Sequence, residues 1–259
     1  MEILLVHIIL AIVQGLSEWL PISSSGHLVL FSHLLGIENS IQFDVAVHLG
    51  TLMAVFVYFG RDICDIAEAI LKGRWKSEKA VLGWMVLIGS IPVAVIGLIF
   101  RKYFELAFES LLFVGVGFLI TSMILFIASL DFKGINEVPR WKVALFIGFC
   151  QAVAIFPGIS RSGSTLAAGL ASKLDMKNAL RFSFLLAIPA IFGASILELG
   201  NSQLPSSFIL PTLVSFIVGL LTIHLIFKYL LTTAKSLRWF ALYEIIIAII
   251  TLIYTIFFR

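Results

Sequence analysis

The sequence predicts an all-α integral membrane protein with six transmembrane helices and two re-entrant helix–loop–helix segments. Of its 259 residues, 60% are hydrophobic and only 13% are charged, whereas charged residues make up about 25% of a typical soluble domain. This composition excludes a soluble fold, and it excludes intrinsic disorder, which requires low hydrophobicity and high charge. The net charge of +3 does not favour nucleic-acid binding. We expect a single polytopic membrane domain over residues 1–259.

Six segments are long and apolar enough to cross a bilayer, which takes about 20 mostly apolar residues in a helix. They are residues 41–60, 80–100, 111–130, 182–199, 208–227 and 240–257. We expect each of them to form one transmembrane helix.

Two further apolar stretches are interrupted by proline, glycine and serine, and each continues only as a piece too short to cross a bilayer. They are residues 3–20 and 143–156, followed by PISSSGH at 21–27 and PGISRSGS at 157–164, and then by short apolar pieces at 28–35 and 166–174. Non-helical backbone is tolerated at membrane depth only inside protein or beside a water-filled cavity. Each stretch is therefore predicted to be re-entrant.

The basic residues predict the orientation, because cytoplasmic loops of membrane proteins carry an excess of Lys and Arg. With this layout, 14 of the 18 basic residues lie on one side: Arg61, Lys72, Arg74, Lys76, Lys79, Lys133, Arg140, Lys142, Lys173, Lys177, Arg181, Lys228, Lys235 and Arg238. The other side has Arg101, Lys102 and Arg259, and Arg161 lies in the second break. The first side is therefore predicted to be cytoplasmic. The first re-entrant segment then opens to the exterior, and the second opens to the cytoplasm.

The two breaks are also related in sequence. An offset of 137 residues places Gln14 on Gln151, and it places Ile22, Ser23, Ser25 and Gly26 on identical residues of the second break, so five of fifteen aligned positions match. Because three spans separate the two segments, the copies must point in opposite directions. The sequence therefore predicts an inverted-topology repeat, with copies at roughly 1–130 and 140–259. Binding sites in such proteins lie at the repeat interface near the midplane of the membrane.

Both breaks have the residue types that bind anions. Small residues expose backbone N–H groups, hydroxyls add donors, and a new helix begins just afterwards, where its partial positive charge attracts anions. Arg161 adds a planar guanidinium that matches phosphate oxygens. An arginine inside the membrane is costly and therefore suggests function, although snorkelling of Arg161 to the cytoplasmic interface is an alternative.

Glu18 is a second charge at membrane depth, and it lies one helical turn after Gln14. Its carboxylate is a candidate ligand for Mg²⁺ or Ca²⁺, which prefer oxygen, and a candidate general base. A salt bridge to Arg161 is the alternative. The offset of 137 places Glu18 on Ile155, so the repeat supplies two anion sites but only one carboxylate.

Several other polar residues are candidates for the same site. His27 and Ser24 are rival nucleophiles, while a capping or phosphate-contacting imidazole is the alternative for His27. Asp44 and His48 share a helix face, either lining the cavity or packing as a buried pair. The remaining small and hydroxyl residues are expected to cap helices or to bind phosphate: Ser23, Ser25, Gly26, Ser160, Ser162, Gly163, Ser164 and Thr165.

These residues make the chain similar to a known family. Residues 14–18 (QGLSE), 21–27 (PISSSGH) and 157–165 (PGISRSGST) resemble motifs of the undecaprenyl-diphosphate phosphatase family, the bacitracin-resistance lipid phosphatases. Supporting stretches lie at 43–52 and 182–189. Together with the layout of the spans, the resemblance covers nearly the whole chain.

The resemblance implies an enzyme of the plasma membrane that removes the terminal phosphate from a polyprenyl diphosphate. The product is the monophosphate carrier, which is reused for peptidoglycan or other surface glycans. The resemblance further implies a site that faces the exterior or periplasm and is assisted by a divalent cation. By motif match, Glu18 is the essential carboxylate, Arg161 the phosphate clamp, and His27 or Ser24 the nucleophile.

One position departs from a two-carboxylate metal site. The family has Glu or Gln at the first acidic position, and this chain has Gln14. A neutral amide binds a cation less well than a carboxylate does, so a lower metal affinity is expected at Gln14 and Glu18.

A transporter is the rival class, because inverted repeats with broken helices are typical of secondary transporters. Such a protein would carry the polyprenyl phosphate lipid across the membrane, alone or in addition to hydrolysis. The sequence leaves the oligomeric state open, with a homodimer among the options.

Overall fold

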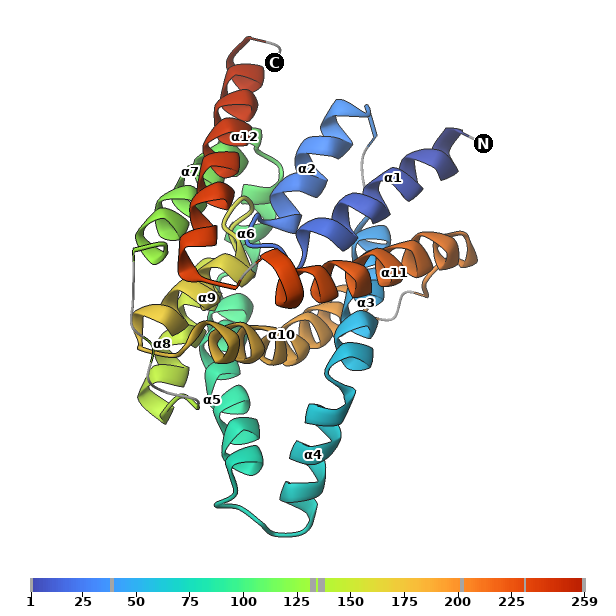
Figure 1. Ribbon diagram of the computed structural model, residues 1–259. Helices are drawn as coiled ribbons and strands as arrows, with labels where there is room; N and C mark the ends of the chain where they lie inside the picture. Colours follow the sequence, from blue (N-terminus) through green and yellow to red (C-terminus); the bar gives the residue numbers. More distant parts are fainter. Residues whose placement is uncertain are drawn as a thin grey trace.

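The computed structural model describes residues 2–37, 40–130, 134, 138–200, 203–230 and 232–257 (Figure 1). The described residues are helical and contain no strand, as expected. Two of the basic residues used to predict the orientation, Lys133 and Arg259, lie outside the described residues. The helices are α1 (Glu2–Ser17), α2 (Ser24–Leu34), α3 (Ile41–Tyr58), α4 (Gly60–Leu71), α5 (Glu78–Ile99), α6 (Arg101–Phe108), α7 (Leu111–Ala128), α8 (Trp141–Val153), α9 (Arg161–Ala171), α10 (Met176–Leu199), α11 (Ile209–Leu225) and α12 (Leu237–Phe257).

Six helices in the described part of the chain are long and apolar enough to cross a membrane, which confirms the predicted number. They are Ile41–Tyr58, Glu78–Ile99, Leu111–Ala128, Met176–Leu199, Ser206–Leu230 and Ala234–Phe257. Large apolar side chains such as Ile99, Phe113 and Ile256 are exposed on their outer faces. This is the surface expected of a protein whose surroundings are lipid.

The fourth spanning helix begins at Met176, six residues before the predicted boundary at 182. The side chain of Asp175 accepts a hydrogen bond from the backbone N–H of Asn178 at 3.0 Å and so caps the helix. The prediction was wrong here because it followed hydropathy. The first turns of α10 are polar, but a capped polar segment is helical all the same.

Most of the large helix–helix contacts join a helix of the first half of the chain to a helix of the second half. The α7–α12 and α3–α10 pairs each join one helix from either half, α11 packs on α1 and α3, and α5 packs on α8 and α10. Figure 1 shows α2 between α1 and the α7–α12 pair, with the α4–α5 hairpin at the opposite end of the molecule. Small residues allow some of these approaches, since a Cβ on Gly148 of α8 would lie 2.1 Å from the carbonyl oxygen of Gly89 on α5.

The two interrupted apolar stretches form helix pairs broken at short turns. α1 ends at Ser17 and α2 begins at Ser24, while α8 ends at Val153 and α9 begins at Arg161. The new helices therefore begin inside the serine-rich motifs, four to five residues earlier than the apolar pieces alone indicate. As a result, Ser24, His27 and Arg161 all lie in the first turn of a helix, next to its exposed N–H groups.

Candidate active site

The first break is built around a strained residue. Ser23 has φ 53° and ψ 89°, a left-handed conformation that costs a residue with a side chain about 1–3 kcal/mol. Its hydroxyl accepts a hydrogen bond from the backbone N–H of Gly26 at 3.4 Å and so caps α2. Ser23 directly precedes Ser24, so its backbone conformation sets the direction in which the chain enters α2 at Ser24.

His27 holds the same strained turn together. Its backbone N–H donates to the Ser23 carbonyl oxygen at 3.1 Å, and its Nδ1 lies 2.8 Å from that oxygen. The other ring nitrogen, Nε2, lies 2.7 Å from the hydroxyl of Tyr243 on α12. The residue is 3% exposed, and its ring packs against Phe118. Both nitrogens of His27 are therefore engaged by protein atoms, as expected of a structural imidazole.

The second break depends on α7. Thr121 of α7 donates its hydroxyl hydrogen to the carbonyl oxygen of Gly158 at 2.8 Å and accepts from the backbone N–H of Ser160 at 2.9 Å. Gly158 has φ +87°, a conformation that glycine adopts without steric cost. The Ser160 hydroxyl then caps α9 by accepting from the N–H of Gly163 at 3.0 Å. Sequence reasoning missed Thr121, which carries no local signal inside an apolar span.

The two breaks touch each other directly. A Cβ on Gly26 would lie 2.9 Å from the Cα of Gly158. The hydroxyl of Ser162 donates across the contact to the carbonyl oxygen of Leu20 at 2.7 Å. The two related breaks therefore lie in direct contact, and the missing side chain of Gly26 permits this close approach.

Glu18 is the centre of the polar cluster at this contact. Its side chain is nearly buried, with the residue 6% exposed. Oε1 accepts a hydrogen bond from Arg161 Nη2 at 2.5 Å, while Oε2 accepts from Ser24 Oγ at 2.5 Å and from Gln14 Nε2 at 2.9 Å. Four predicted site residues thus lie in one cluster, and the Glu18–Arg161 salt bridge named as an alternative is present.

Only part of the Arg161 guanidinium is engaged by the described residues of the protein. Its Cζ lies 5.2 Å from the centre of the Trp19 ring, a cation–π contact that stabilises the positive charge. Nη2 binds Glu18, but the buried Nη1 has no hydrogen-bond partner among the described residues. A buried, unpaired cationic donor is costly unless a ligand satisfies it. Nη1 is therefore poised to bind an anion that enters the cluster.

His48 on α3 extends the cluster. Its Nε2 lies 3.6 Å from Glu18 Oε2, and its Nδ1 donates to the backbone carbonyl oxygen of Asp44 at 2.7 Å. Of the two predicted arrangements, His48 lines the site. Asp44 contributes its backbone carbonyl, while its buried Oδ1 has no partner in the described part of the chain.

The other predicted phosphate ligands use their hydroxyls within the protein. Ser23 and Ser160 cap helices, and their hydroxyls lie 3.5 Å from Ser25 and 3.2 Å from Ser162 respectively. Thr165 donates to the carbonyl oxygen of Arg161 at 2.8 Å. The capping role is confirmed for Ser23 and Ser160, and direct phosphate binding by this set of residues stays a prediction.

The donor set allows a test of the predicted cation site. Among the described residues, no three His, Cys, Asp or Glu side chains form a metal-binding group. Glu18 offers one carboxylate, and the buried Gln14 Oε1 has no hydrogen-bond partner within the ranges that the structure describes. Mg²⁺ typically binds one or two carboxylates and completes its ligands with substrate phosphates and water. The pair Glu18 and Gln14 fits that mode of binding, in which the protein supplies few ligands, once the amide turns so that Oε1 rather than Nε2 faces Glu18.

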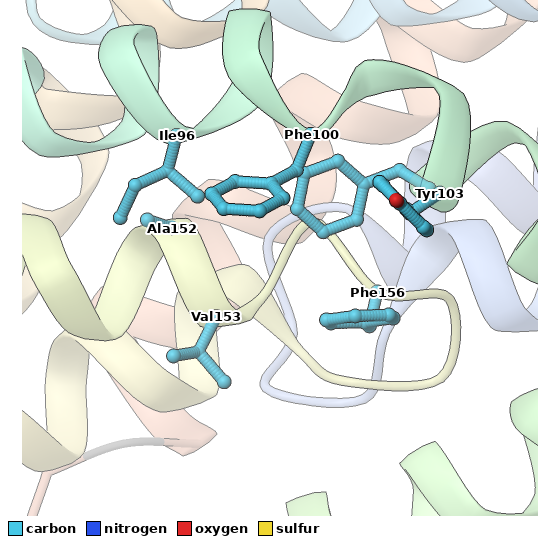
Figure 2. A pocket seen from close by; sticks show the side chains of 7 residues that line it. Ile96, Phe100, Tyr103, Ala152, Val153 and Phe156 are labelled. Carbon is cyan, nitrogen blue, oxygen red and sulfur yellow. The ribbon is translucent and has the colours of Figure 1, made fainter.

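An apolar pocket lies beside the second break, and sequence reasoning did not identify it. Figure 2 shows the side chains that line it, which come from the end of α5, from α6 and from the end of α8: Ile96, Phe100, Tyr103, Phe104, Ala152, Val153 and Phe156. Phe156 precedes Gly158 by two residues, a span of at most about 7 Å. The pocket is therefore close to the contact between the two breaks.

Fold and site together define a class: polytopic helical membrane proteins in which two broken helices bring a carboxylate, a serine and an arginine into one buried cluster. The comparisons with known proteins narrow this class. The model of the family "Bacitracin resistance protein BacA" matches residues 7–250. The chain therefore belongs to this family, as the motifs predict.

Curated relatives match almost end to end. A protein of Methanosphaera stadtmanae named "Undecaprenyl-diphosphatase" is 38% identical, with 96% of this chain and 97% of the relative covered. Relatives of the same name from Thermosipho africanus and Korarchaeum cryptofilum are 42% and 43% identical, over 94% and 93% of this chain and 97% and 95% of theirs.

Proposed function

We propose that this protein is a membrane phosphatase that hydrolyses undecaprenyl diphosphate, or a similar polyprenyl diphosphate, to the monophosphate carrier lipid. The relatives named above carry that activity in their names. The observation that carries the proposal is the Glu18 carboxylate, which binds the Ser24 hydroxyl through one oxygen and Arg161 through the other. Arg161 Nη1 has no partner in the part of the chain that the structure describes.

Ser24 is the nucleophile in this proposal. Its hydroxyl donates to Glu18 at 2.5 Å, so the carboxylate can take the proton as the oxygen attacks. Ser24 Oγ forms a bond to the terminal phosphorus, and the bond from that phosphorus to the bridging oxygen breaks. The lipid monophosphate leaves, and water then cleaves the phosphoserine to inorganic phosphate and free Ser24. His27, the rival nucleophile, has both ring nitrogens engaged.

Arg161 stabilises the charge that gathers on the phosphate oxygens, which is the main task in phosphoryl transfer. Nη1 donates to a phosphate oxygen while Nη2 keeps its bond to Glu18. A bound Mg²⁺ or Ca²⁺, held by Glu18 and Gln14, would neutralise further charge on the diphosphate. The isoprenoid tail lies outside this polar cluster, and the apolar pocket beside Phe156 has the chemistry to contact it.

We further propose that the two broken helix pairs are re-entrant copies of an inverted repeat. The pairing of helices supports this, because α1 packs on α11 as α8 packs on α5, and α3 packs on α11 as α10 packs on α5. The repeat axis then runs between α3 and α10 and between α7 and α12. The pseudo-repeats 1–130 and 140–259 are halves of one domain under this proposal.

The proposed location is the plasma membrane, with the site open to the exterior or periplasm. The excess of basic residues on one side supports the orientation. Lys79 and Arg181, both assigned to the cytoplasmic side, meet at Asp62 through hydrogen bonds of 2.8 and 2.6 Å.

Lipid transport is the second candidate function. Broken helices paired between two halves of a chain are the arrangement through which many transporters alternate access. A protein of this kind would move the monophosphate lipid between leaflets, alone or after hydrolysis.

One experiment separates the two. Purified protein in detergent is given a polyprenyl diphosphate, and released phosphate is measured for the wild type, Ser24→Ala and the control Ser90→Ala, whose hydroxyl donates to the Val86 carbonyl oxygen within α5 at 2.8 Å. We expect release by the wild type and Ser90→Ala and at least a thousandfold loss for Ser24→Ala. Absence of release from any diphosphate lipid, together with movement of labelled polyprenyl phosphate across liposomes, would overturn the phosphatase and favour the transporter.

A further inference from the structure

Tyr243 of α12 contacts His27, which follows the first break, the turn between α1 and α2. The hydroxyl of Tyr243 on α12 lies 2.7 Å from Nε2 of His27 on α2, 216 residues away in the sequence. The two rings are stacked, with centroids 5.6 Å apart and planes 8° apart. His27 is 3% exposed, so this contact takes place inside the protein.

The hydrogen-bond partners fix the direction of each bond. The Ser23 carbonyl oxygen, 2.8 Å from Nδ1, can only accept, so Nδ1 carries the hydrogen. In the neutral imidazole, Nε2 then has the lone pair, and the Tyr243 hydroxyl must donate to it. A chain of two hydrogen bonds therefore runs from Tyr243 through His27 to the backbone of Ser23.

This chain ends on the strained residue of the turn. Ser23 has φ 53°, and its carbonyl oxygen accepts two hydrogen bonds from His27, one from the backbone and one from the ring. The carbonyl belongs to the peptide group that links Ser23 to Ser24. Rotation of that peptide would move Ser24 Oγ away from Glu18, to which it donates at 2.5 Å. Precise placement of a nucleophile is worth large factors in rate.

We propose that Tyr243 is a positioning residue for the reaction: through His27 it holds the Ser23–Ser24 peptide so that the Ser24 hydroxyl stays on Glu18. This proposal rests on the proposed function of Ser24 as nucleophile. It assigns to α12 a part in a site whose sequence motifs lie in the two breaks and in the helix end before the first break. It also gives His27 a role that needs no contact with substrate.

The test is Tyr243→Phe, which keeps the stacked ring and removes only the hydroxyl. We expect kcat for phosphate release to fall about tenfold, the effect of one buried hydrogen bond on a barrier, while KM stays unchanged. The matched control is Tyr254→Phe. The Tyr254 ring, also on α12, meets His33 of α2 edge to face, away from the break. We expect wild-type kcat from the control.

A double-mutant cycle shows whether Tyr243 acts through His27. His27→Asn keeps a donor near the position of Nδ1 and removes Nε2, so adding Tyr243→Phe to it should cost no further activity. Additive losses would overturn the proposal, and so would wild-type kcat in Tyr243→Phe. A lowered melting temperature with wild-type kcat per folded molecule would also overturn it and leave Tyr243 a packing residue. Activity retained by Ser24→Ala is a separate result, which would overturn the proposed function instead.

Discussion

Ser24 and Arg161 bind opposite oxygens of the same carboxylate, each at 2.5 Å from Glu18. The two residues also occupy the same position in their respective breaks, since Ser24 plus the offset of 137 gives Arg161. Each is the first residue of the helix that follows its break. The repeated backbone therefore places two different chemical groups, a hydroxyl and a guanidinium, on either side of one acid.

This arrangement predicts that Arg161→Lys loses most phosphatase activity although it keeps the charge. A lysine has one ammonium group, so it cannot hold Glu18 with one nitrogen and offer a second, fixed nitrogen to phosphate. We expect kcat to fall about a hundredfold or more in a phosphate-release assay in detergent. The control is Arg101→Lys, an exposed arginine paired with Glu105, which should leave turnover unchanged. Near-normal turnover by Arg161→Lys would refute the clamp role.

Gln14→Glu should tighten cation binding. The Gln14 amide donates to Glu18 at 2.9 Å, so a second carboxylate there repels the first until a cation lies between them. We expect the variant to melt at a lower temperature than the wild type in EDTA, and to gain more than the wild type when Mg²⁺ or Ca²⁺ is added. Calorimetric titration with the cation should show about tenfold tighter binding. An equal response of both proteins would argue against a cation at Gln14 and Glu18.

The pH dependence of stability should depend in part on Asp62. Partial burial raises the pKa of the Asp62 carboxyl, but hydrogen bonds from Arg181 and Lys79 outweigh it and hold the pKa below its ordinary value. Asp62 therefore stabilises the fold above the pKa of an unfolded aspartate, about 3.9, and this contribution is lost as pH falls through the lower folded value.

Thermal melting in detergent between pH 7 and pH 3 checks this expectation. The wild type should lose melting temperature as the solution is acidified, and Asp62→Asn should start lower and lose less. Asp65→Asn is the control, because Asp65 is more exposed and, among the described residues, pairs with Lys79 alone, at 3.1 Å. Parallel curves for the wild type and Asp62→Asn would contradict the assignment.

Glu244→Gln should stabilise the protein or leave its stability unchanged. Glu244 on α12 is fully buried, and neither of its carboxylate oxygens has a partner among the described residues. Burying an unsatisfied polar group costs about 1–3 kcal/mol, and an ionisable carboxylate costs at least as much to bury as a neutral amide of the same shape. A melting temperature lowered by several degrees, measured against Glu198→Gln, would mean that Glu244 binds a group essential to the fold.

Much of the fold could be predicted because it depends on local physics. A membrane helix needs a long apolar run, so composition alone located all six spans. The breaks were predictable because proline, glycine and serine interrupt such runs. The meeting of Glu18 and Arg161 was predictable because charges inside a membrane must find partners. In each case the signal lies in a few neighbouring residues.

The remainder depends on contacts between distant segments. Thr121 and Tyr243 lie in apolar spans, and nothing in their neighbourhoods indicates that one braces the second break and the other reaches His27. The early start of α10 at Met176 was not predicted, because the cap at Asp175 extends the helix into polar sequence that hydropathy alone does not mark as helical. The nucleophile was left open because the hydrogen bonds that occupy His27 exist only in the folded chain.

The contact between Gly26 and Gly158 has a further consequence. A methyl group added at Gly26 would lie 2.7 Å from the Phe118 ring and 2.9 Å from the Cα of Gly158, and one added at Gly158 would lie 2.2 Å from the Val114 carbonyl oxygen of α7. Either would force the two halves of the molecule apart. Any residue larger than glycine there would shift a whole helix pair, and with it the acid relative to the guanidinium.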